Sequence, residues 1–107
     1  MNQEKTAEEK LLIAFYKARQ KKLRSIEESR GPVSEGEKQT KLTVDLGSAQ
    51  PFLDDPSDDL IREAEALTNL IRRGWLEPVG DPSTRGLYSM AKFKPVGMRQ
   101  ARELTES

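Results

Sequence analysis

Residues 55–93 constrain the fold more than any other segment, because they contain a clear helix start, a clear helix stop and two strand-like runs. Asp55 is a residue type that caps helix N-termini, and Pro56 follows it at the first helical position. Gly74 is the residue type that ends a helix by adopting the left-handed conformation. The sequence therefore predicts one helix over residues 55–73.

This predicted helix is amphipathic. Its apolar residues recur at intervals that place them on one face, which we expect to be buried. They are Leu60, Ala64, Leu67 and Ile71, flanked by Ile61 and Leu70. The opposite face carries Arg62, Ala66, Asn69 and Arg73 at the same spacing, with Arg72 beside them in the last turn.

Strand-like segments follow the helix. Residues 75–79 and 87–93 are rich in apolar side chains, and a loop from Gly80 to Gly86 with turn-forming residues at both ends separates them, so they predict a β-hairpin. Residues 41–46 alternate between apolar and polar side chains and predict a third, short strand.

The remaining segments predict two further helices and a connection. Thr6 and Glu9 have the spacing of a capping box, which predicts a helix start before Ala7, and that helix continues to about Glu28. Its apolar face is formed by Leu12, Phe15, Tyr16, Leu23 and Ile26. Arg19 projects into this face, so its stem extends to solvent, its guanidinium meets a carboxylate, or it marks where the helix leaves the core. Residues 29–40 lack bulky apolar groups and predict a flexible connection. Pro95 precedes a last helix over residues 96–105.

The run from Leu67 to Val79, followed by a glycine-bounded loop and the sequence Leu87-Tyr-Ser-Met, resembles the third helix and wing of winged helix-turn-helix proteins of the MarR or PadR kind. The resemblance covers residues 55–105. It departs from the family's pattern over residues 47–54, where Pro51 and the lack of periodicity give no sign of the short second helix.

The resemblance and the patterns together predict a fold class. We expect a single α+β, winged-helix-like domain over residues 1–107, with three to four helices and a small antiparallel three-stranded sheet. The sheet would consist of strand 41–46 and hairpin 75–79/87–93. Winged helices bind DNA, RNA or other proteins, so the fold alone does not fix a function.

The composition argues against an enzyme. The chain has no cysteine and no histidine, which removes thiol nucleophiles, imidazole bases and the usual zinc ligands. It also has no phosphate-binding loop, nucleophile elbow or dinucleotide-binding fingerprint. The sequence therefore predicts a protein that is not an enzyme and that uses no cofactor.

Four carboxylates surround the predicted helix start, and they are Asp54, Asp55, Asp58 and Asp59. Oxygen ligands of this kind can hold a divalent cation. Helix capping and the helix dipole explain them more simply, and their spacing matches no calcium loop. No metal site is predicted.

The sequence gives no sign of a membrane partner. The longest apolar run, Leu11 to Tyr16, is far too short to cross a bilayer. The polar first residues do not resemble a signal peptide. We therefore expect a cytoplasmic protein.

Basic side chains are the candidate binding residues. The chain contains 18 basic and 18 acidic residues, so any surface that attracts nucleic acid has to be local. Three groups of side chains could form such a surface. They are Arg62, Asn69, Arg72 and Arg73 on the helix face, Arg85 in the hairpin loop, and Lys17, Lys21 and Arg24 opposite the apolar face of the first helix. Arginine recognises guanine and asparagine recognises adenine, so the helix face is suited to a major groove.

Each group also has a simpler interpretation as solvated surface, and the acidic helix start opposes phosphate. Two functions therefore remain. The first is a small winged-helix protein that binds double-stranded DNA, as a homodimer joined through its terminal helices, and acts as a transcriptional regulator or a mobile-element protein. The second is a winged-helix module that contacts another protein and does not bind DNA. Convergence of the three basic groups on one side favours DNA, and divergence favours the module.

Overall fold

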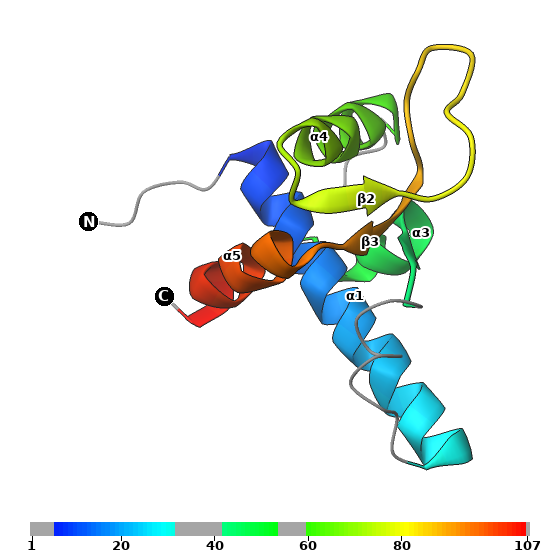
Figure 1. Cartoon of the computed structure of the whole chain (residues 1–107), viewed down its shortest axis with the longest axis vertical. Helices are drawn as coiled ribbons and strands as arrows, with labels where there is room; N and C mark the ends of the chain where they lie inside the picture. The colour runs from blue at the N-terminus through cyan, green and yellow to red at the C-terminus, as the bar shows by residue number, and fades with distance from the viewer. Residues whose placement is uncertain (1–5, 32–41, 54–59, 107) are drawn as a thin grey trace.

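The computed structural model describes residues 6–31, 42–53 and 60–106, and the structural statements below concern these residues. This part of the chain contains four α-helices, a 3-10 turn and a small three-stranded antiparallel sheet (Figure 1). The predicted fold class, α+β with a winged-helix-like arrangement, is confirmed.

The helices are α1 (Ala7–Arg30), α3 (Leu46–Ala49), the 3-10 helix η1 (Gln50–Phe52), α4 (Leu60–Arg72) and α5 (Pro95–Glu106). The strands are β1 (Val44–Asp45), β2 (Leu76–Pro78) and β3 (Met90–Phe93). No helix in the described part of the chain is long and apolar enough to cross a membrane.

Helix α1 begins with the predicted capping box. The Glu9 backbone N–H donates to Thr6 Oγ1 at 3.2 Å, and the Thr6 N–H donates to Glu9 Oε1 at 3.0 Å. Every buried residue of α1 lies at or before Arg19, which is itself only 6% exposed. The second half of the helix therefore leaves the core beyond Arg19, which is one of the alternatives that the sequence left open. Leu23 and Ile26, expected on the apolar face, are only half-buried.

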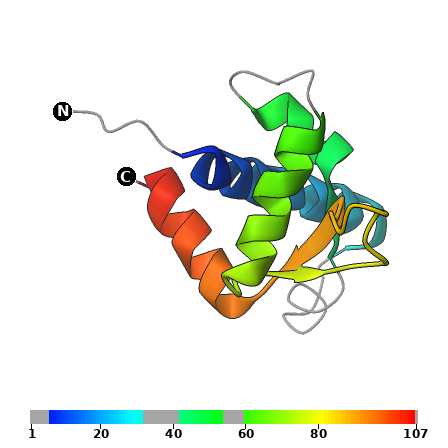
Figure 2. The same ribbon diagram turned by 90° about the horizontal axis from the view of Figure 1, so that it is seen from above.

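The core lies where the first half of α1 meets α4, α5 and the sheet. Figure 2 shows α4 lying across this half of α1. The largest fully buried side chains are Phe15, Leu11, Leu12, Leu67, Leu70 and Leu76. The ring of Tyr16 meets that of Phe93 edge-on, with centroids 6.3 Å apart, and joins α1 to the sheet.

Strand β3 lies in the centre of the sheet, in the order β1-β3-β2. Ala91 opposes Val44 of β1, and Phe93 opposes Leu76 of β2. Ala91 and Phe93 are buried while Met90 is exposed, because alternate side chains of a strand point to opposite faces. One face of the sheet therefore covers the core.

The strands are shorter than predicted. Leu46 belongs to α3 and not to β1, because Asp45 caps a helix there by accepting the Ser48 N–H at 2.9 Å. The returning strand begins at Met90 and not at residue 87. Within residues 87–89, the Tyr88 N–H donates to a helix side chain and not to a neighbouring strand.

A short helical segment occupies part of residues 47–54, where the sequence pattern left a second helix undecided. Helix α3 runs directly into η1, and Leu46 and Ala49 are buried against α1. Pro51 is compatible with this segment because it lies in the first turn of η1, where a missing N–H has no helical partner to lose.

The predicted helix stop at Gly74 is confirmed. Gly74 has φ +82°, its N–H donates to Ile71 O at 3.0 Å, and the Trp75 N–H donates to Leu70 O at 3.2 Å. These two bonds form a Schellman motif, which satisfies carbonyls at the end of α4. The predicted start at Asp55 and Pro56 lies outside the described residues, as does most of the predicted connection 29–40.

Helix α5 begins at Pro95 and is held closely against the end of α4. The Lys94 N–H donates to Trp75 O at 3.2 Å. Gly97 is buried so close to this carbonyl that a Cβ atom built on it would lie 1.8 Å from Trp75 O. This contact fixes the start of α5 against Trp75, which directly precedes β2.

Candidate nucleic-acid interface

The outward face of α4 is rotated relative to the prediction. Ala66 was expected on that face, but it is 6% exposed and packs in the core with Leu70. Among residues 61–73, the exposed ones are Ile61, Arg62, Glu65, Arg72 and Arg73, and Asn69 is half-buried. The outward face therefore has Glu65 and Asn69 near its centre, Arg72 and the 45% exposed Ile61 on the side nearest Thr68, and Arg62 and Arg73 on the other side.

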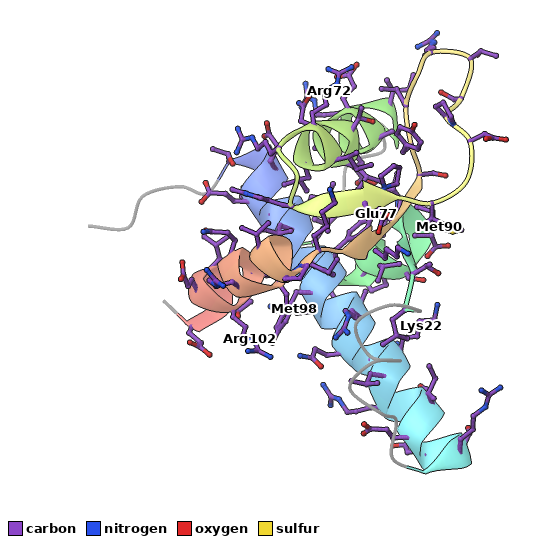
Figure 3. The ribbon with its side chains drawn as sticks, in the orientation of Figure 1. Lys22, Arg72, Glu77, Met90, Met98 and Arg102 are labelled. Carbon is purple, nitrogen blue, oxygen red and sulfur yellow. The ribbon has the colours of Figure 1, made fainter. Side chains whose placement is uncertain are left out.

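Arg73 has contacts of its own within the protein. Its guanidinium lies 5.4 Å from the centroid of the Trp75 ring, and its Nη2 lies 4.0 Å from Glu8 Oε1. These interactions orient the side chain over the end of α4. Arg72, in the preceding position, is exposed and points away from the body of the protein in Figure 3.

The hairpin loop, residues 79–89, forms the wing. Ser83 closes its tip: the Gly86 N–H donates to Ser83 O at 2.8 Å, and Ser83 Oγ accepts the Arg85 and Leu87 N–H groups at 3.3 and 3.2 Å. Arg85 lies within this turn and is exposed. The turn places an arginine at the end of the wing.

A buried threonine joins the wing to α4. Thr68 is 4% exposed, and its hydroxyl donates to Ala64 O at 2.8 Å and accepts the Tyr88 N–H at 3.2 Å. One side chain of α4 therefore holds the base of the wing. In Figure 1 the wing extends to the same end of the molecule as α4.

The basic residues of α1 lie elsewhere. Lys17, Lys21 and Arg24 are exposed beside Phe52 of η1. The neighbouring Lys22 donates from Nζ to Thr43 O at 2.8 Å, and Figure 3 shows it on the half of α1 that projects away from α4 and Arg72. Two of the three predicted groups therefore share one end of the molecule, and the α1 group is separate from them.

The inner face of α4 carries a buried carboxylate. Glu63 is 7% exposed, its Oε2 accepts from Gln50 Nε2 at 3.3 Å, and its Oε1 is buried without a hydrogen bond. This side chain links α4 to η1 behind the outward face. No group of three or more acidic side chains that could hold a metal ion occurs among the described residues, and the Asp54–Asp59 cluster lies outside them.

Sequence reasoning missed the residues that shape this interface. Thr68 is a single threonine within a helix, and no local pattern links it to Tyr88, which is 20 positions away. Ser83 had a detectable signal, because serine in a turn that ends in glycine often accepts backbone N–H groups.

Comparison of the chain with protein-family models, curated proteins and solved structures found no match.

Proposed function

We propose that this protein binds double-stranded DNA, with α4 in the major groove and the wing tip against the neighbouring backbone or minor groove. The observation that supports this proposal is that Arg72 and the wing, which carries Arg85, lie at one end of the molecule. The Thr68–Tyr88 hydrogen bond joins α4 to this wing. A helix of this length fits the major groove, and an exposed arginine is the side chain that most often recognises guanine there.

The proposal assigns different roles to the candidate residues. Arg72, with Asn69 beside it, contacts base edges, while Arg85 contacts phosphate or the minor groove. Arg62 adds positive charge to the face, whereas Arg73 is positioned by Trp75 and Glu8 and contributes mainly through its field. The α1 residues are not part of this interface. A winged-helix protein of the MarR or PadR kind would act in this way as a cytoplasmic regulator or a mobile-element protein.

A second function is favoured by a separate observation. The half of α1 that carries Lys22 projects away from α4, and the formal net charge of the whole chain is zero. Both features suit a winged-helix module that contacts another protein and does not bind DNA. Of the three groups, the helix face and the wing still share one end, so DNA binding remains the first proposal.

The test is a titration of a fluorescent duplex at several salt concentrations. We expect Arg72→Ala with Arg85→Ala to weaken binding, and each lost phosphate contact to reduce the slope of log affinity against log salt by ~0.9. Arg102→Ala is the matched control, because Arg102 is an exposed arginine of α5 on another part of the surface (Figure 3). Absence of binding to any duplex at low salt would leave the protein module as the function.

A further inference from the structure

A shallow groove lies between the second half of α1 and the α3–η1 segment. The part nearest η1 is lined by Lys17, Lys21, Arg24 and Phe52, and the part nearest the sheet by Lys22, Pro51 and Met90. Lys21 lines both parts, so they form one continuous surface, which we call the basic groove. Its position on the projecting half of α1 separates it from the outward face of α4 (Figure 3).

The basic groove carries an excess of positive charge. Within the described residues, Lys17, Lys21 and Arg24 form no ion pair. Its two carboxylates are Glu28 and Asp45, and Asp45 is held by Ser48 and faces Lys22. The charge of Lys22 is therefore offset within the protein, while Glu28 is the one carboxylate among the described lining residues on the side of the other three cations. A negatively charged partner would complete this surface.

One wall of the groove is apolar. Phe52 is half-buried against the core, Pro51 is exposed, and Met90 is 36% exposed on the outer face of β3. Apolar side chains beside lysines provide sites for apolar groups of a ligand, whereas a nucleic-acid backbone offers mainly phosphate and sugar. The mixture of a cationic wall and an apolar wall suits a ligand that carries both carboxylates and apolar side chains.

We propose that the basic groove binds an acidic peptide segment of a partner protein, with its carboxylates on Lys17, Lys21 and Arg24 and separate apolar side chains against Phe52 in one part and Met90 in the other. Because the groove and the α4 face are separate surfaces, this proposal does not depend on DNA binding. A protein with both sites would hold a partner on α1 while α4 remains accessible.

The probe is a short fluorescein-labelled peptide of glutamate and aspartate with leucine at every third position, titrated at low salt and followed by anisotropy. We expect saturable binding that weakens as salt is added. Lys21→Glu should weaken it by about tenfold, because it reverses the charge that both parts of the groove share. Arg102→Glu, the same charge change on α5, should leave affinity within about twofold of the original.

Three outcomes would overturn the proposal. The first is equal loss of affinity in the Lys21→Glu and Arg102→Glu variants, which would mean that only overall charge matters. The second is unchanged affinity for a peptide with alanine in place of leucine, which would mean that the apolar wall is not used. The third is that duplex DNA displaces the peptide, and that the affinity of the protein for this DNA falls with Lys21→Glu but not with Arg72→Ala. That result would make the groove a nucleic-acid surface.

Discussion

Replacement of Gly97 by alanine tests how α5 packs against the end of α4. Gly97 lies in the first turn of α5, beneath the Trp75 carbonyl that accepts the Lys94 N–H. An added Cβ would lie 1.8 Å from Trp75 O and 2.7 Å from Trp75 C. Both are backbone atoms, so no side-chain rotation can relieve the overlap.

The magnitude follows from two opposing effects. Alanine in place of glycine within a helix ordinarily stabilises by about 1 kcal/mol. Real Cβ atoms essentially never lie within 3.0 Å of such an atom. The Trp75 carbonyl and α5 would therefore have to move apart until the distance rises from 1.8 Å to at least 3.0 Å. Because Ala101 of the same helix is fully buried, α5 cannot shift without opening the core. Overpacking typically costs about 1–3 kcal/mol, and an overlap with two backbone atoms falls at the upper end of that range, so we expect a net loss of about 2 kcal/mol.

Urea unfolding followed by circular dichroism measures this loss. The midpoint should fall while the slope with denaturant stays the same. Gly47→Ala is the matched control, because Gly47 is an exposed helical glycine whose added Cβ would come no closer than 3.8 Å to Asp45 Oδ2. That variant should keep its stability or gain slightly. If Gly97→Ala is as stable as Gly47→Ala, the packing of α5 on Trp75 has been misjudged.

Two further predictions concern single hydrogen bonds. Thr68→Val should lower the free energy of unfolding by about 1–3 kcal/mol, because the Tyr88 N–H loses its acceptor. Hydrogen exchange of the Tyr88 amide should accelerate, and unchanged exchange would show that the wing is held in another way. The pKa of the Asp45 carboxyl is lowered by hydrogen bonds from the Ser48 side chain and backbone N–H, with Lys22 adding to the effect. The stability that Asp45 contributes is therefore present above its ordinary pKa of about 3.9 and is lost as pH falls through the lower folded value. The Asp45→Asn variant should therefore have a lower free energy of unfolding than the original protein at pH 6, and this difference should disappear in acid. A difference that does not change with pH would contradict this reasoning.

Signals confined to a few neighbouring residues predicted the structure well. The Thr6 capping box and the Gly74 stop depend only on residues within one helical turn, and both form as expected. Segment lengths were less predictable. Residues 87–89 have strand-like composition, but the Tyr88 N–H donates to Thr68 of α4, a contact between distant parts of the chain that shortens β3.

The short segment formed by α3 and η1 could not be predicted because its stability comes from tertiary packing. It offers only two buried side chains, Leu46 and Ala49, and both pack into the core that includes α1. Short helices gain little from local propensity. A pattern with two apolar residues and a proline therefore gives no periodic signal.

The candidate site was predicted in part. The arginines of α4 are exposed as expected, but the face is rotated because Ala66 and Leu70 are more deeply buried than Ala64 and Ile71. The position of Lys17, Lys21 and Arg24 relative to α4 depends on how the two helices cross. A helical wheel describes one helix and contains no information about that crossing.

The central claim is that α4 and the wing contact duplex DNA, and mapping of backbone amide NMR signals on addition of a duplex tests it most directly. We expect the largest shifts at Asn69, Arg72 and Arg85 at low salt, with small shifts at Arg102 on α5. A contradictory result would be shifts confined to α1 or α5, or no shifts at all at a large molar excess of duplex.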